Sequence, residues 1–495
     1  MILDIKELHK NPPYGMIAIL FIGAFASLLN NTLLNIALPT IMVEFNVKPS
    51  IVQWITTGYM LVNGILIPAS AFFIQKFTNR KIYITAMGFF ALGTALAMMA
   101  PSFIILVIAR MLQACGSAMM MPLLMNVMLV VFPPERRGTA MGFFGLVMFT
   151  APAIGPTLSG WVVEHYSWRI LFAIVLPFAL FTLIYAFFKL KNVTPNRDVR
   201  LDVFSLILSS IGFGSLLFGF SVAGDEGWGS LHVYGTIIVG FISLVIFIIR
   251  QLKMDDPILD FKIYKHPMFA LSSAIMITVS VAMFSGMILT PLYVQTVREI
   301  SPFYSGLLML PGAILMGIMS PITGRLFDKY GARIMALIGL SITILTTFLL
   351  SRLTMDDSYF YIMFIYTVRM FGMSLVMMPV MTNGLNQLPM PSYPHGTAMN
   401  NTLQQVSGAI GTALLLTVMT KRMESAGEEL AKEAEAGNFP ATGTTNIESE
   451  IMNLAMLKGI NLSFFVATIA AIVAFILAFF IKRVKAPSIP IRKDN

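Results

Sequence analysis

The chain has few charged residues. Asp, Glu, Lys and Arg make up 12% of its 495 residues, against about 25% in ordinary soluble domains. A large soluble helical core would need polar helix faces, and the long apolar segments of this chain lack them. The scarcity of charge excludes a set of soluble domains and predicts an all-α polytopic membrane protein.

Cysteine is also nearly absent, and several functional motifs are missing. The single cysteine, Cys115, lies in an apolar stretch, so the chain cannot form an internal disulfide. The sequence has no nucleotide-binding G-x-x-x-x-G-K-[ST] loop, no metal-ligand spacing and no intramembrane His/Asp/Glu cluster. These absences argue against an ATP-driven pump, a metal site and a membrane enzyme, and we expect no cofactor. Without a sizeable soluble domain, a receptor is disfavoured too.

Apolar runs are abundant instead. A helix of about 20 apolar residues crosses roughly 30 Å of hydrocarbon, and such runs recur along the whole chain, 57% of which is hydrophobic. We predict fourteen transmembrane helices, at residues 15–41, 51–74, 82–100, 103–131, 139–163, 168–190, 203–224, 231–250, 268–295, 303–323, 334–351, 358–383, 396–419 and 457–481.

Basic residues set the expected orientation. Lys and Arg are concentrated in the connections that would share a side with the N-terminus, and cytoplasmic loops carry such an excess. Both termini are therefore expected in the cytoplasm, with the protein in the cytoplasmic membrane of a bacterium. The same excess accounts for the net charge of +9 without a nucleic-acid partner. We expect a monomer in contact with the lipid bilayer.

Polar connections suggest how the chain is divided. One, at 191–202, follows the sixth predicted helix, and another, at 251–267, follows the eighth. We therefore predict a six-helix half at 1–190, a linker with two inserted helices at 191–267, and a second six-helix half at 268–495. The loop 420–456 favours helix in its first part and is Gly/Thr-rich in its second; it either caps an outer vestibule or is a solvated acidic loop.

Two short basic connections form a repeat. ASAFFIQKFTNRK (69–81) follows the second predicted helix, and GRLFDKYGAR (324–333) follows the tenth. Two similar halves in one chain are typical of transporters that rock around a site near the midplane.

Several motifs resemble those of a known family. GRLFDKYGAR is similar to the cytoplasmic loop motif of the major facilitator superfamily. RMLQACGSA (110–118), GLVMFTAPAIGPTLSGW (145–161), SWRILFAIVLP (167–177), LTPLYVQ (289–295), SGLLMLPGAI (305–314) and HGTAMNNTLQQVSGAIGTALL (395–415) resemble its fourteen-helix drug:proton antiporter branch. Within that branch the lincomycin-resistance type of multidrug exporter is most similar.

The resemblance implies a major facilitator fold and a set of conformational residues. In the fifth helix, small residues and prolines permit close helix approach and a bend; ordinary helix packing is the alternative. In the loop 324–333, Asp328 with nearby basic residues could form a charged latch, whereas the first-half loop has Gln75 in that place. The conformational residues are Gly145, Gly155, Pro156, Gly160, Gly324, Asp328, Gly331 and Arg333.

Polar residues inside the predicted helices are the candidates for a substrate cavity. A transmembrane arginine costs about 2.5–3.5 kcal/mol and normally faces a cavity or a partner, so Arg110 is the leading candidate, with snorkelling to the outer headgroups as the alternative. Gln113 lies one turn away on the same face. Arg369 either faces the cavity or pairs structurally. The remaining candidates are Asn30, Asn31, Asn35, Gln53, Asn63, Asn126, Asn400 and Gln404.

Carboxylates are missing where proton coupling would need one. None of the 24 Asp and Glu residues lies in the middle of a predicted helix, although a partly buried carboxylate is the usual proton carrier. The family's first-helix pattern has an aspartate where this chain has Asn30. The candidates for proton coupling are then Glu164 with His165, and Glu44, each of which could also be a plain loop residue.

Together these features predict a secondary active exporter of amphipathic small molecules, either drugs or toxic metabolites, by alternating access with proton antiport. The alternative is an exporter or flippase of an endogenous lipid or metabolite that need not be coupled to protons.

Overall fold

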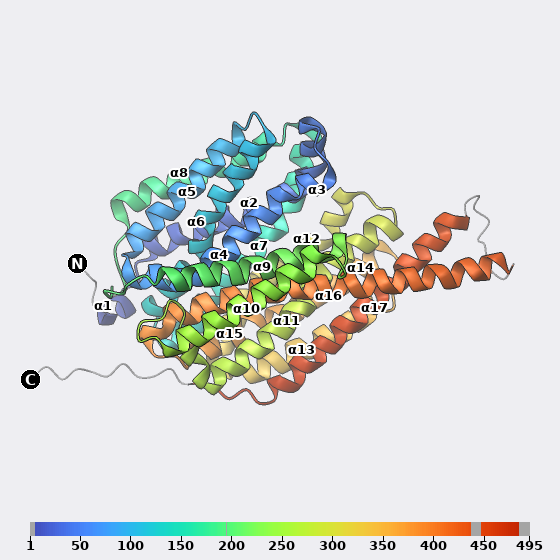
Figure 1. Ribbon diagram of the computed structural model, residues 1–495. Helices are drawn as coiled ribbons and strands as arrows, with labels where there is room; N and C mark the ends of the chain where they lie inside the picture. Colours follow the sequence, from blue (N-terminus) through green and yellow to red (C-terminus); the bar gives the residue numbers. More distant parts are fainter. Residues whose placement is uncertain (1–4, 195, 437–446, 485–495) are drawn as a thin grey trace, which may run out of the picture.

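The computed structural model describes residues 5–194, 196–436 and 447–484. Over these ranges it is a bundle of helices without a strand, shown in Figure 1. Fourteen of the described helical segments are long and apolar enough to cross a membrane. The prediction of fourteen transmembrane helices is confirmed.

The membrane-spanning helices fall into three consecutive groups. The first six are α2 (Tyr14–Phe45), α4 (Trp54–Lys76), α5 (Asn79–Met98), α6 (Phe103–Val131), α7 (Arg137–His165) and α8 (Arg169–Lys189). Two follow, α9 (Val203–Glu226) and α10 (Leu231–Lys253). The last six are α11 (Pro267–Leu292), α12 (Pro302–Tyr330), α13 (Ala332–Leu350), α14 (Tyr359–Ser374) with α15 (Met377–Leu385), α16 (Tyr393–Glu435) and α17 (Ile447–Ala478).

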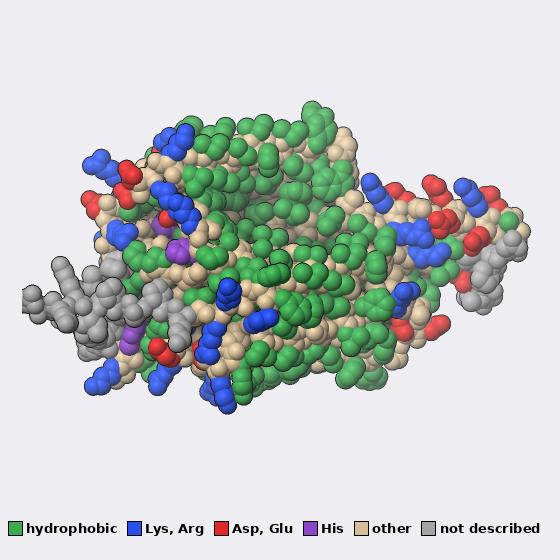
Figure 2. Space-filling model, turned by 90° about the horizontal axis from the view of Figure 1, so that it is seen from below, with side chains coloured by type: hydrophobic (Ala, Val, Ile, Leu, Met, Phe, Trp, Pro, Cys, Tyr) green, Lys and Arg blue, Asp and Glu red, His purple; other side chains and the backbone are tan. Residues whose placement is uncertain are grey.

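Short helical segments precede or join the long helices. They are α1 (Ile5–Lys10), α3 (Pro49–Val52), η1 (Pro134–Arg136), η2 (Phe261–Lys265), η3 (Tyr293–Val297) and η4 (Met390–Ser392). Helix α2 begins and α17 ends on the same face of the bundle, at the left in Figure 1. We call this the terminal face and the opposite one the far face. Figure 2 shows charged side chains gathered toward both faces, with an apolar belt between them.

The two six-helix groups meet mainly along α7 and α12, while α16 packs against α4 and α6. Helix α9 lies against both α4 and α16, and α10 packs on α9. The helix pair therefore touches both groups at one side of the bundle. The division at residues 190 and 267 itself stays a prediction.

Several helices differ from their predicted extents; α17, for example, begins at Ile447, ten residues before the predicted start at 457. Two further differences have a visible cause. The predicted helix 358–383 is broken into α14 and α15, because Pro379 has no N–H to donate to the carbonyl of Leu375; the amides of Leu375 and Val376 bond three residues back instead. Helix α16 continues beyond the bundle to Glu435, where Ala426 and Leu430 pack against Ala455 of α17. The first part of the loop 420–456 is thus helical, as expected, and residues 437–446 lie outside the described part.

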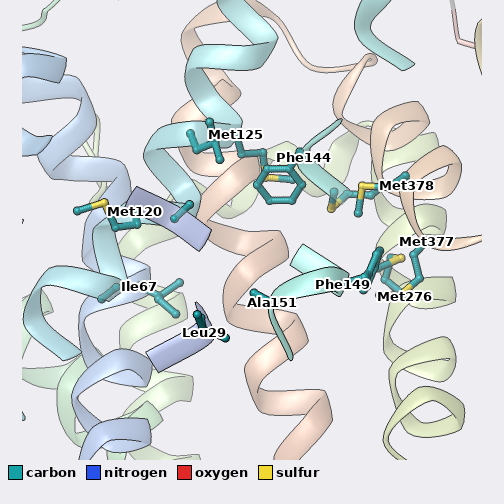
Figure 3. Close-up of a cluster of buried hydrophobic side chains, with 14 of the residues drawn as sticks. Leu29, Ile67, Met120, Met125, Phe144, Phe149, Ala151, Met276, Met377 and Met378 are labelled. Carbon is teal, nitrogen blue, oxygen red and sulfur yellow. The ribbon is translucent and has the colours of Figure 1, made fainter. Parts of the chain in front are cut away.

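Flexible apolar side chains fill the contact between the two groups. Figure 3 shows Phe149 of α7 beside Met276 and Met377 of the second group, and all three are buried. Phe144 lies close to Met378 in the same view. Because methionine repacks easily, this contact can tolerate relative movement of the groups.

Candidate functional site

Arg110 is buried in the first six-helix group, with 1% of its surface exposed. Its Nη1 donates to Gln113 Oε1 at 2.8 Å, and its guanidinium lies 4.2 Å from the centre of the Tyr59 ring. Within the described residues, Nε and Nη2 have no hydrogen-bond partner and no carboxylate pairs with the charge. A cation–π contact and one amide therefore compensate this charge.

A chain of polar side chains links Arg110 to three neighbouring helices. Gln113 Oε1 also accepts a bond from Asn30 of α2 at 3.0 Å, and Gln113 Nε2 donates to Thr94 of α5 at 2.8 Å. A second branch runs from Tyr59, whose hydroxyl donates to Ser117 at 2.8 Å. The Ser117 hydroxyl in turn donates to Asn63 Oδ1 at 3.0 Å. We call these residues, with Arg110, the Arg110 network.

Sequence reasoning found part of this network. Asn30, Asn63, Arg110 and Gln113 were candidates, and the structure brings them together. Thr94, Tyr59 and Ser117 were missed. Ser117 had a usable signal, because it follows Arg110 by seven residues and therefore shares its helix face.

Arg369 occupies the fourth helix of the second group, as Arg110 does in the first. It is fully buried. Its Nε donates to Thr347 of α13 at 3.1 Å, and Nη2 donates to the carbonyl of Ala282 and to Ser285, both on α11. Gly286 makes room for it, since a Cβ there would overlap the guanidinium. Arg369 thus pins three helices of the second group together.

The remaining amide candidates are scattered. Asn31, Asn400 and Gln404 are half-buried, while Gln53 is exposed at the far-face end of α4. Asn126 is buried near the terminal face, where it lines a cavity of about 120 Å³ together with Gln75 and Arg197. The side chain of Asn35 lies outside the described part of the structure.

The candidates for proton coupling lie at the far face, away from the Arg110 network. Glu44 accepts bonds from Trp168 at 2.6 Å and from Arg169 at 2.7 Å. Partial burial raises the pKa of Glu44, but these bonds and the Arg169 charge outweigh it and hold the pKa below its ordinary value. Glu164 and His165 are exposed. Among the described residues, the buried polar side chains include no carboxylate.

Asp328, in the loop motif, joins the two groups at the terminal face. Its carboxylate accepts bonds from the backbone N–H of Gly138 at 2.9 Å and of Thr139 at 3.0 Å, and from the Thr139 hydroxyl at 2.9 Å. These are the unpaired amides of the first turn of α7, where the helix dipole favours an anion. Asp328 thus acts as a side-chain cap for a helix of the other group.

The basic residues that the sequence suggested as partners of Asp328 lie elsewhere. Arg325, Lys329 and Arg333 are exposed, and the described salt bridges do not include Asp328. Arg483 instead donates to the backbone carbonyls of Asp328 and Lys329. Gly331, with φ of +83°, makes the turn into α13 that favours glycine.

Glycines allow α7 and α12 to approach closely. A Cβ at Gly324 would overlap the carbonyl of Gly138, and one at Gly145 would lie 2.8 Å from Ser320 Oγ. On another face of α7, a Cβ at Gly155 would overlap Thr32 of α2. Gly160 is different, since its nearest neighbour would be 3.9 Å away, and Pro156 lies within the helix near Gly306.

In the first group, the corresponding connection, residues 69–81, has different bonding partners. The amide of Gln75 lies 3.1 Å from Nε2 of His395, at the start of α16, and the backbone N–H of Asp260 donates to Nδ1 of the same ring at 3.2 Å. The connection after α8 also binds this segment: the N–H of Arg197 donates to the Gln75 carbonyl at 2.9 Å. Nearby, Arg137 donates to Asn386 at 3.3 Å across the groups.

Comparison with known proteins agrees with this architecture. Residues 20–412 match the sequence profile of the Major Facilitator Superfamily. The uncharacterised MFS-type transporter YhcA of Bacillus subtilis is 45% identical, over 99% of this chain and 97% of that protein. The lincomycin resistance protein LmrB of the same organism is 43% identical, over 95% of this chain and 96% of its own length.

A solved structure has the same fold. The human organic anion transporter MFSD10 (TETRAN) superposes with a TM-score of 0.64, covering 94% of this chain and all of that one, at 13% identity. At this identity the likeness concerns the fold alone.

Proposed function

The chain belongs to the major facilitator superfamily, and on that basis we propose that it exports amphipathic small molecules by alternating access, coupled to proton antiport. Relatives named for lincomycin resistance and multidrug resistance support an antibiotic or toxic metabolite as cargo. The terminal face would be the cytoplasmic one, because most Lys and Arg residues of the connections lie there.

The observation that carries alternating access is the closure of the terminal face by separable polar contacts. Asp328 caps α7, Arg137 bonds Asn386, and Gln75 meets His395. Each contact joins side chains or helix ends of the two groups, so each can break and re-form without unfolding a helix. Release of all three would open this face to the cytoplasm.

The Arg110 network supports a preference among substrates. Its charge has no carboxylate partner within the described residues, and Asn30 and Gln113 are neutral amides. A positive charge without a counter-ion repels cations in a low-dielectric site. We therefore expect neutral or anionic amphipaths to be exported in preference to lipophilic dications.

A second candidate function is export of an endogenous lipid. A cavity of about 570 Å³ between α4, α5 and α6, lined almost entirely by apolar side chains, favours it. The two functions differ in cargo and share the alternating movement.

Reconstitution into liposomes tests the proposal. Uptake or efflux of neutral, anionic and dicationic amphipaths, and of a fluorescent phospholipid, is measured under imposed pH and voltage gradients. Transport of an amphipath that follows the pH gradient supports proton antiport. Movement of the phospholipid alone favours the second candidate, and a lack of response to pH removes the antiport claim.

A pair of glycine variants tests the closed state. Gly324→Ala places a methyl group against the Gly138 carbonyl and should prevent closure of the terminal face, whereas a Cβ at Gly88 of α5 meets nothing within 4 Å. We expect Gly324→Ala to lose transport and Gly88→Ala to retain it, at equal amounts of folded protein.

A further inference from the structure

The cavity between α4, α5 and α6 is a separate feature from the Arg110 network. Its volume is about 570 Å³, within the range of small-molecule sites. Phe73 of α4, Phe77 just after it, Phe89 of α5 and Met119 of α6 are among the apolar residues that line it. Phe77 and Phe89 are exposed, so the cavity opens to the outside of the bundle.

The cavity has one charged residue, at its terminal-face end. Lys81 lines it at the first turn of α5, and the lining includes no acidic residue. The neighbouring bases are occupied: Lys76 donates to the Val199 carbonyl, and Arg80 to the carbonyl of Phe187. Within the described residues, the Lys81 ammonium makes no hydrogen bond or ion pair, although its backbone N–H donates to the Thr78 hydroxyl.

The length of the cavity matches one leaflet. It follows α5 from Lys81 to Phe89, which corresponds to about 12 Å at 1.5 Å per residue. Roughly 15 Å of hydrocarbon separates a headgroup from the bilayer midplane. A molecule that fits this cavity has an apolar chain about as long as one leaflet is thick, and an anionic group at the membrane surface.

We infer that this cavity is a binding site for one anionic phospholipid of the terminal-face leaflet, with its phosphate at Lys81 and an acyl chain between α4, α5 and α6. The charge at one end and the apolar lining elsewhere match the two ends of such a lipid. Cys115 lies at the inner end of the site and, as the only cysteine of the chain, reports on its occupancy. The inference does not depend on export, since binding needs no gradient.

The test uses the full-length protein in nanodiscs. Phosphatidylglycerol or phosphatidylcholine, each with a photoactivatable diazirine in one acyl chain, is added at a low fraction and cross-linked. We expect phosphatidylglycerol to label residues 66–89 and 115–119 about fivefold more than phosphatidylcholine does, the factor expected of one Lys near an anionic lipid. Bound phosphatidylglycerol should also slow the alkylation of Cys115 by N-ethylmaleimide.

Matched variants separate the site from the general lipid surface. Lys81→Gln should remove the preference for phosphatidylglycerol and Lys81→Arg should keep it, while Thr85→Phe, at an exposed lining position, should block labelling by both lipids. Lys253→Gln, an exposed base on α10 at the same face, should change nothing. Equal labelling by the two lipids, or displacement of both by a transported amphipath instead of by unlabelled phosphatidylglycerol, would overturn the inference.

Discussion

Two buried arginines occupy corresponding helices of the two groups but are bound differently. Arg110 makes one hydrogen bond, to the side chain of Gln113, and leaves Nε and Nη2 without a partner. Arg369 bonds a backbone carbonyl and two hydroxyls, and only its Nη1 has no partner. Backbone atoms of α11 move only with the helix, whereas the amide of Gln113 can rotate. The comparison assigns a fixed structural role to Arg369 and an adjustable one to Arg110.

The largest expected effect separates these roles. Arg369→Gln removes well-formed bonds to α11 and α13, and bonds to a charged group contribute about 1.5–3 kcal/mol each. We expect a lower melting temperature and a lower yield of folded protein. Arg110→Gln removes two unpaired buried donors along with one bond, so its melting temperature should change little. Transport per folded protein should fall about tenfold or more, the equivalent of one lost hydrogen bond between the charged group and the substrate.

Thermal unfolding of purified protein and liposome transport, normalised to folded protein, measure both effects. Arg110→Lys and Arg369→Lys serve as controls that keep the charge. If both glutamine variants lost stability to the same extent with transport unchanged, the assignment of different roles would be wrong.

Two of the polar contacts that close the terminal face also differ in how firmly they are bonded. Asp328 binds three donors at the start of α7, whereas Gln75 meets the single side chain of His395 at the start of α16. A charged cap contributes about 1–2 kcal/mol. We expect Asp328→Asn to shift the equilibrium toward an open terminal face by up to about tenfold, and Gln75→Ala to shift it less.

Distance measurement between spin labels checks this order. Glu135 and Lys482 are exposed positions on opposite groups. Spin labels on cysteines introduced at both positions, in a Cys115→Ser background that removes the native cysteine, move apart when this face opens. A larger opening in Gln75→Ala than in Asp328→Asn would contradict the ranking of these contacts.

A smaller change concerns the charge of the Arg110 network. Asn30→Asp would replace the amide group that now bonds Gln113 with a carboxylate, within the same network as Arg110. The anion would offset the arginine charge, and we expect a several-fold gain in resistance to dicationic antiseptics. Growth inhibition of a susceptible bacterial host measures it, with Asn63→Asp as a control in the other branch. Strong resistance in the unmodified protein, without a gain in Asn30→Asp, would contradict the expected substrate preference.

The sequence was sufficient for the fold because apolar length alone defines transmembrane helices. It missed the break between α14 and α15, although Pro379 was visible, because proline is tolerated within many of the other spanning helices here, such as α4 and α6. The helical extension of α16 to Glu435 was expected from the first part of the loop 420–456, but its packing against α17 was not.

The candidate site was predictable only where its residues stand out within a single helix. A buried arginine is conspicuous in an apolar segment, and helical spacing links it to Gln113. Tyr59, which contacts the guanidinium, and Thr94, which bonds Gln113, belong to separate helices and carry no charge, so nothing in the sequence connects them to Arg110. The partners of Asp328 were missed because two of its three donors are backbone N–H groups of α7, which no side-chain pattern reveals.

The smallest expected effect tests whether the far-face ion pair takes part in coupling. The bonds from Trp168 and Arg169 lower the pKa of Glu44 in the folded protein. The pair therefore stabilises the fold above the unfolded-chain pKa of about 4.3, and this contribution disappears as pH falls through the lower folded value. Because both side chains are partly exposed, it amounts to less than about 1 kcal/mol. Glu44→Gln should lower the melting temperature slightly at pH 7, lose that difference in acid, and leave the pH dependence of transport unchanged. A shifted transport profile in Glu44→Gln, but not in Glu164→Gln, would instead make Glu44 the proton carrier and move coupling away from both arginines.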